Sequence, residues 1–451
     1  MLRIPRLYWY SNDPDRGSPF CYEESRALKL TIHDSSFSQL PDSELKAYEL
    51  LKELGRLSEL DVLQFLPGDH LHIQLKNETE GYVDIFIENG DGWQQGYIEI
   101  KELAWTRCAS EHEERECLEL LAHRKLRRDI FITMSDYLIS KREGFSNQNI
   151  LTPTEALKVV GLFLRSRNNW TYLMNAKGSR AGACKESFYW ILMRHKLPNM
   201  WSYHSACAQT GGYDSSLMNL SSSVLDRCYT VLQARDEIGK QFYGDADHET
   251  ILYHFNYLFL LITGVLDAQA RIIHENYSFN GSAQHTGFTK KEFLKKLQKH
   301  VPAVHKVVTK PENEALIKLL HNLRNTIHGS GHKAHEHQFP GAEKELDIEL
   351  SNEIAVDVLA AAEKLGCTRT DGIYKHELKS FIVNGVEQGP KSFVHVEPYN
   401  FASYLIDHAF KLFDEIAKET KVSISDTSTP LTSSMPDDWV FRASRFDLLG
   451  G

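Results

Sequence analysis

The chain has 451 residues, of which 42% are hydrophobic and 25% are charged. This length exceeds what one hydrophobic core usually organises, so we expect two or three domains. The formal net charge of −10 argues against a nucleic-acid coat protein or a membrane-surface protein, since both usually need a basic excess. It leaves room for an enzyme that touches RNA through a few local cations.

The sequence predicts a cytoplasmic protein. Residues 1–6 lead directly into aromatic and polar residues, without the apolar core of a secretory leader. The most apolar stretch, residues 257–266, is too short to span a bilayer, so we expect no membrane association. The seven cysteines include no Cys-x-x-Cys pair, which favours reduced, mostly buried thiols over a disulfide framework or a zinc site.

The first part of the chain reads as a mixed α/β domain, which we assign to residues 1–200. Thr152, Pro153 and Glu155 have the pattern of a helix N-terminus with a capping box. The expected strands are 27–32, 71–75, 82–87, 97–100 and 129–134, and the expected helices are 43–57, 111–125 and 152–167. Residues 170–215 give no clear pattern, and the domain boundary is expected within them.

The following part, residues 201–421, predicts an all-α helical bundle, so the fold class expected for the whole chain is α+β. Apolar residues recur with helical spacing in 216–240, 248–277, 290–300, 311–328, 351–365 and 400–420. A polar loop rich in histidine is expected after Gly329, up to about residue 341. The tail 422–451, rich in Ser, Thr, Pro and Asp, is expected to be loosely ordered.

The end of the helix expected over 311–328 carries Arg324, Asn325 and His328. Positions i and i+4 of a helix share a face, so Arg324 and His328 lie side by side. The histidine could act as a general acid or base near neutral pH, and the arginine could hold a phosphate and stabilise transition-state charge. RNA supplies its own nucleophile, the 2′-hydroxyl. Asn325 could orient the histidine or the phosphate.

This part of the chain resembles the HEPN superfamily of helical-bundle proteins over about residues 215–420. The resemblance rests on a long apolar helix that ends in 266–271, which includes Asp267, and on the later segment 323–328. It implies a metal-independent ribonuclease of bacterial antiviral defence or a toxin system, acting as a homodimer on RNA, with Arg324, Asn325 and His328 catalytic and Asp267 a secondary candidate. A regulatory protein or a phage component would be the trigger.

The spacing departs from the family pattern. Four to six residues usually separate the arginine from the histidine, but three separate Arg324 from His328, and seven separate Arg324 from His332, the other secondary candidate. An Arg-Asn pair and a histidine at a helix C-terminus can also simply cap carbonyl groups. The alternative is therefore a non-catalytic HEPN-like bundle that serves dimerisation or partner binding.

Two other groups of residues suggest metal chemistry. Residues 129–136 resemble the strand-and-acid segment of PIN-like nucleases, in which carboxylates hold Mg²⁺ or Mn²⁺ for hydrolysis. The candidate ligands in this third hypothesis are Asp34, Glu116, Asp129 and Asp136. In the histidine-rich segment, His335 and His337 could bind a transition metal, although a solvated loop is the more common reason for such a run.

Overall fold

The computed structural model describes part of the chain, and this part includes most of the predicted helices and strands. The described residues are 7, 9, 17–21, 26–33, 41–65, 72–76, 82–89, 92–99, 111–142, 145, 148–173, 180–182, 184–211, 215–244, 247–329, 331–338, 344–350, 354, 364, 368–370, 373–375, 382–386 and 393–420. The chain divides into two compact units, made up mainly of residues 2–182 and 183–444. The division falls inside the 170–215 stretch but before residue 200, because helices α6 (Lys185–Lys196) and α7 (Pro198–Gly211) pack with the helices that follow them.

A parallel sheet forms the centre of the first unit. Its strands are β1 (Leu28–His33), β2 (Leu60–Phe65), β6 (Ile130–Ile132) and β7 (Ile150–Leu151), in the order β2-β1-β6-β7. All three pairings are parallel. Five of the six β1 residues are buried, as expected for a parallel strand covered on both faces.

Helices α1 (Asp42–Leu54), α3 (Glu111–Lys125), α4 (Asp136–Lys141) and α5 (Pro153–Ser166) accompany this sheet. The predicted capping box of α5 is confirmed: the Thr152 side chain accepts from the Glu155 amide, and the Glu155 carboxylate accepts from the Thr152 amide. The strands predicted at 71–75 and 82–87 are β3 (His72–Lys76) and β4 (Tyr82–Asn89), which pair with β5 (Gly92–Glu99) in an antiparallel sheet. A further pair joins β8 (Thr171–Leu173) to β9 (Arg180–Gly182).

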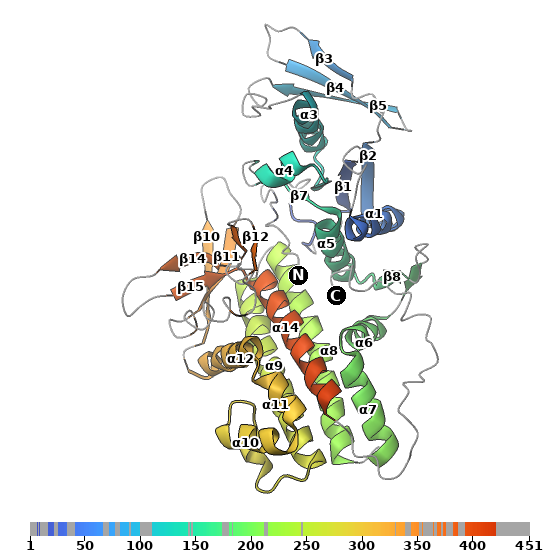
Figure 1. Ribbon diagram of the computed structural model, residues 1–451. Coiled ribbons are helices and arrows are strands. Elements are labelled where there is room, and N and C mark those ends of the chain that lie inside the picture. The colour runs from blue at the N-terminus through green and yellow to red at the C-terminus, as the bar shows by residue number, and fades with distance from the viewer. Residues whose placement is uncertain are drawn as a thin grey trace. The chain divides into compact units, whose positions relative to one another are not determined.

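The second unit is built around three long helices. Helices α8 (Ser216–Tyr243) and α9 (His248–Asn276) pack along each other, and α14 (Pro398–Glu419) lies against both (Figure 1). Shorter helices α10 (Lys291–His300), α11 (Pro302–Val308) and α12 (Pro311–Gly329) complete the helical part. Among the described helices, α9 alone is long and apolar enough to cross a membrane by composition, but half of its most apolar window is buried within the fold.

The expectation of an all-helical second unit is corrected in one respect. A four-stranded antiparallel sheet follows α12, in the order β10 (Lys333–Gln338), β11 (Lys344–Leu350), β15 (Phe393–Val396) and β14 (Ile382–Val386). The stretch predicted as a histidine-rich loop contains strand β10. Leu346, Ile348 and Leu350 alternate along β11 and are buried, a strand periodicity that the many polar residues around it obscured.

A small hairpin of β12 (Thr368–Thr370) and β13 (Ile373–Lys375) belongs to the same unit. The helix predicted over 351–365 and the tail 422–451 lie outside the described residues, except for Ile354 and Lys364. The fold class is α+β, as predicted: a parallel sheet with helices, followed by a helical bundle that also carries an antiparallel sheet.

Candidate functional site

Helix α12 presents two different faces. Its buried face consists of Leu316, Ile317, Leu319, Leu320 and Leu323, and the helix packs against α9. The helix ends at Gly329, and the Gly331 amide closes the end by donating to the Thr326 carbonyl at 2.8 Å. Gly331 has a φ of +71°, a left-handed conformation that glycine adopts without a steric penalty and that commonly ends helices.

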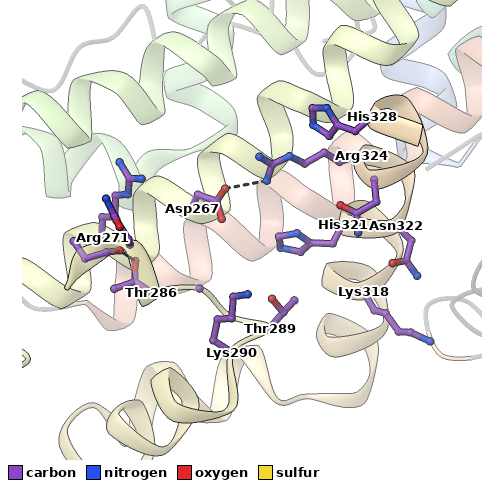
Figure 2. A pocket seen from close by; sticks show the side chains of 14 residues that line it. Asp267, Arg271, Thr286, Thr289, Lys290, Lys318, His321, Asn322, Arg324 and His328 are labelled. Atoms are coloured by element: carbon purple, nitrogen blue, oxygen red, sulfur yellow. Dashed lines mark hydrogen bonds and ion pairs between the residues drawn. The ribbon is translucent and has the colours of Figure 1, made fainter. Parts of the chain in front are cut away.

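The other face of α12 lines a pocket of about 610 Å³. The opposite walls come from α9 and from the segment between α9 and α10, as Figure 2 shows. The polar side chains of the pocket are those of Asp267, Arg271, Gln284, Thr286, Thr289, Lys290, Lys318, His321, Asn322, Arg324, Asn325 and His328. The structure therefore brings Arg324, Asn325, His328 and Asp267 to one cavity, whereas His332 does not line it.

The lining of the pocket is strongly basic. Arg271, Lys290, Lys318 and Arg324 face it, against the carboxylate of Asp267. A local excess of cations in a protein with a net charge of −10 creates a positive potential at one place on the surface. Such a cavity is suited to a ligand that carries several negative charges, such as a phosphodiester chain.

Arg324 and Asp267 form an ion pair across the pocket wall. Arg324 Nη1 lies 3.1 Å from Asp267 Oδ2, and the two side chains are 35% and 39% exposed. Figure 2 shows the arginine reaching from α12 towards α9 to make this contact. The ion pair orients the guanidinium of Arg324. Because a guanidinium carries five N–H donors, further donors of Arg324 can still bind a phosphate.

The pocket contains two imidazoles, His321 and His328. Burial lowers the pKa of His321 below its ordinary value of 6.5; the Asp267 carboxylate opposes the shift, and the Arg324 and Lys290 cations add to it. The neutral form of His321, which can accept a proton, is therefore favoured near neutral pH. His328 is exposed at the end of the helix.

Three pocket residues on α12 were not predicted from the sequence as part of a site. Lys318, His321 and Asn322 lie at spacings of three and four residues, in register with Asn325 and His328. Residues with these spacings share one helix face. This polar stripe opposite the leucine stripe was the signal that could have identified them.

His332, a secondary candidate, has a structural position. It is 5% exposed, and its Nδ1 lies 2.7 Å from Asn256 Oδ1. Burial lowers its pKa to about 4. A neutral histidine held in this way stabilises the start of the sheet after α12, away from the pocket.

The three described acids of the N-terminal metal hypothesis each have their own surroundings. Asp129 accepts from Arg26 at 2.6 and 2.8 Å and from the Lys29 amide at 2.8 Å. Glu116 is buried and accepts from the Ser135 hydroxyl at 2.7 Å, whereas Asp136 is exposed in the first turn of α4. These three acids form no metal-binding group among the residues that could be described, and Asp34 lies outside those residues.

No family model, curated protein or solved structure was found to match this chain.

Proposed function

We propose that the protein is an RNA-cleaving effector of the HEPN type, whose active site is the basic pocket beside α12. The observation that carries the proposal is the gathering of four cations and two imidazoles in one cavity of an otherwise acidic protein. The cations would hold the phosphates of a single strand, and the imidazoles would move protons. Neither role needs a metal ion, because RNA carries its own nucleophile.

The cleavage step is an internal transfer. His321, favoured in its neutral form, accepts the proton of the 2′-hydroxyl as the 2′-oxygen attacks the adjacent phosphorus. The bond from phosphorus to the 5′-oxygen breaks, and His328, as general acid, gives that oxygen a proton. Arg324, oriented by Asp267, stabilises the charge that develops on the non-bridging oxygens. The products are a 2′,3′-cyclic phosphate and a 5′-hydroxyl.

The cellular setting follows from the resemblance to HEPN proteins. We place the protein in the bacterial cytoplasm as a homodimer, in antiviral defence or a toxin system, with a regulatory protein or phage component as its trigger. The described cysteines, at positions 21, 117, 184, 207 and 228, are not joined in disulfides with one another, which is compatible with a reducing compartment.

The test is cleavage of a mixed tRNA substrate by the purified full chain in EDTA, with analysis of the product ends. We expect cyclic phosphate ends, with activity reduced at least a hundredfold in Arg324→Ala and His328→Ala. His285→Ala is the matched control, since His285 is exposed beside the pocket but does not line it. Undiminished cleavage by both pocket variants would refute the proposal.

Two other results would point elsewhere. Cleavage lost in EDTA and restored by Mg²⁺ would move the chemistry to carboxylates, as in the PIN-like hypothesis. Binding of RNA that needs Arg324 but never leads to cleavage would support the non-catalytic alternative.

A further inference from the structure

The antiparallel sheet of the second unit gathers four polar side chains on one face. In the register of the strands, His335 on β10 lies opposite Asp347 on β11, and Glu349 on β11 lies opposite His395 on β15. Residues directly opposite each other, and residues two apart on one strand, share a face of a sheet. The other face carries Ile348 and Val396, which are fully buried.

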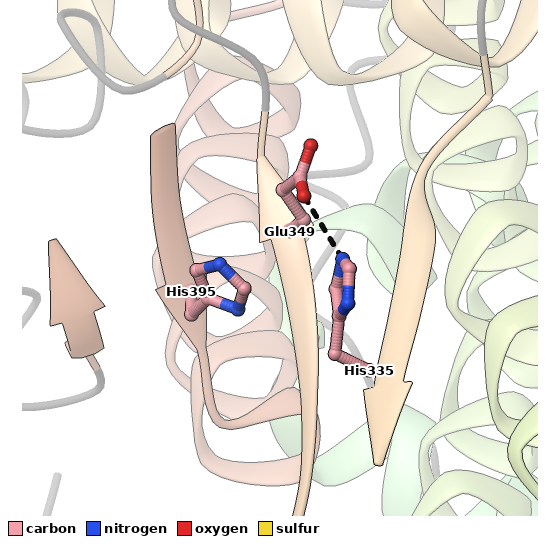
Figure 3. Close-up of side chains that lie close together, drawn as sticks. All are labelled: His335, Glu349 and His395. Carbon is pink, nitrogen blue, oxygen red and sulfur yellow. Dashed lines mark hydrogen bonds and ion pairs between the residues drawn. The ribbon is translucent and has the colours of Figure 1, made fainter. Parts of the chain in front are cut away.

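Three of these side chains converge at their tips. His335 Nε2 lies 2.9 Å from Glu349 Oε2, as the dashed line in Figure 3 shows. The ring centroids of His335 and His395 are 5.0 Å apart, and one ligand atom from each of His335, Glu349 and His395 lies within 4.8 Å of the others. Donor atoms around a tetrahedral ion are about 3.4 Å apart, given metal–ligand distances of about 2.0–2.2 Å. Side-chain rotations that move the three ligand atoms by about 1 Å would bring them to the distances that such an ion requires.

Asp347 supplies an orienting contact. Its Oδ1 lies 2.6 Å from His395 Nδ1, and the two side chains are 2% and 6% exposed. A carboxylate on one ring nitrogen fixes the tautomer and the ring orientation of a histidine that binds a metal through its other nitrogen. This arrangement of carboxylate, histidine and metal is common in zinc proteins and raises the basicity of the ligand.

We propose that His335, Glu349 and His395 bind a divalent transition metal, with Zn²⁺ as the preferred ion. Two imidazoles and one carboxylate match the ligand types that zinc accepts, and they leave a fourth position for water or another ligand. The side chains of His335 and Glu349 are 37% and 27% exposed, which gives the ion a path to the site. None of the three lines the basic pocket, so the inference does not depend on the proposed ribonuclease.

The ion would tie three strands together. Strand β10 begins at Lys333, shortly after α12 ends at Gly329, so a metal on His335 would also restrain the chain that leaves the pocket helix. From the sequence, His337 was the expected partner of His335. The structure instead offers partners on neighbouring strands, and the side chain of His337 lies outside the described residues.

The experiment measures metal directly. Full-length protein is stripped with EDTA, dialysed, loaded with Zn²⁺ or Co²⁺, passed through a desalting column, and analysed by mass spectrometry for metal and by visible absorbance for Co²⁺. We expect about one equivalent of Zn²⁺ per chain, a Co²⁺ spectrum of low coordination number, and a higher melting temperature with Zn²⁺. His335→Ala and Glu349→Gln should lose the retained metal, while Asp347→Asn should weaken binding by about 10- to 100-fold.

His285→Ala is again the control, because this exposed histidine lies outside the sheet. Glu349→Gln keeps the shape of a partly exposed side chain, so its folding, checked by circular dichroism, separates loss of metal from loss of structure. Absence of retained metal in the wild-type protein would overturn the proposal, as would metal content that stays unchanged in His335→Ala and Glu349→Gln. Neither result bears on RNA cleavage, which is measured separately.

Discussion

Arg324 on α12 and Asp267 on α9 are joined by an ion pair of 3.1 Å on the wall of the basic pocket. The carboxylate has two opposite effects on the proposed chemistry: it positions the guanidinium, and it lowers the positive charge available to a phosphate.

Replacing Asp267 with Asn should separate these two effects. We expect RNA to bind a few times more tightly, because the repulsive charge is gone, while kcat falls about tenfold because Arg324 loses its orientation. The free energy of unfolding should change by less than about 1 kcal/mol, since both side chains are partly exposed. Single-turnover cleavage measures the rate of the chemical step, and filter binding measures the affinity for RNA. A fall in binding with unchanged kcat would contradict a positioning role for Asp267.

Lys290 and Lys318 should contribute to affinity rather than to the chemical step. For binding to single-stranded RNA, the slope of log K against log salt is about −0.7 per phosphate neutralised. Each Lys→Ala variant should weaken RNA binding and make the slope shallower by about 0.7. Both effects should be the same for RNAs of different sequence. Lys299→Ala, on the exposed side of α10 and outside the pocket, is the control and should leave the slope unchanged. If both pocket variants show the salt dependence of the wild-type protein, these lysines do not contact the RNA.

His321 should govern the acidic side of the pH profile. Burial lowers its pKa below 6.5. As a general base, His321 therefore stays neutral and active until the pH falls to this lowered pKa. As the pH is raised through the acidic range, the logarithm of kcat/KM should rise and should reach its plateau before pH 6.5. His321→Gln should lower the rate by about 10²–10⁴-fold and abolish this inflection. An acidic limb that persists unchanged in the variant would assign the base to another group.

His332 should make the second unit sensitive to acid. Its folded-state pKa is lowered to about 4, so below pH 6.5 the unfolded chain takes up a proton that the folded chain does not. The stability it contributes is present above pH 6.5 and is lost as the pH falls to about 4, by on the order of 3 kcal/mol.

Hydrogen exchange of peptides from α9 and β10 at several pH values measures this loss in the second unit alone. His332→Asn, which retains a donor for Asn256, should flatten the pH dependence. His123 in the first unit also has a pKa lowered by burial, to about 3, so global unfolding of the whole chain would mix the two contributions. An unchanged pH dependence in His332→Asn would show that another group titrates.

Asp129 should matter for folding rather than for catalysis. Its carboxylate is 5% exposed and receives a two-point contact from Arg26. Asp129→Asn leaves the arginine without its charge partner, which typically costs about 3–5 kcal/mol. We expect a lower melting temperature for the first unit and unchanged RNA cleavage per folded molecule. Cleavage lost from a variant that remains fully folded would revive the metal-dependent hypothesis.

The helices of the second unit could be predicted well because each buries one regular apolar stripe. The predicted 248–277 and 311–328 correspond to α9 and α12 within one residue at each end. The sheet after α12 was missed for a physical reason. The sequence of β10 consists of charged residues, histidines, one glutamine and one alanine, so it lacks the large apolar residues that distinguish a strand from a loop.

The site was partly predictable. The i and i+4 spacing placed Arg324 and His328 on one face, and both line the pocket. Lys290 could not be predicted, because its place depends on how the segment before α10 returns to α12. The cluster of His335, Glu349 and His395 could not be predicted for the same reason: 45 residues separate Glu349 from His395 in the sequence, and only strand pairing brings them together.

The order of the parallel sheet has a consequence for how the chain is made. Strand β1 lies between β2 and β6, and its pairing with β6 joins Ile32 to Ile132. At synthesis rates of about 5–20 residues per second, β1 leaves the ribosome roughly 5–20 seconds before its second neighbour is made. During this interval one edge of an apolar strand is uncovered. The first unit should therefore depend on chaperones during translation, and slower codons upstream of β6 should lengthen that dependence.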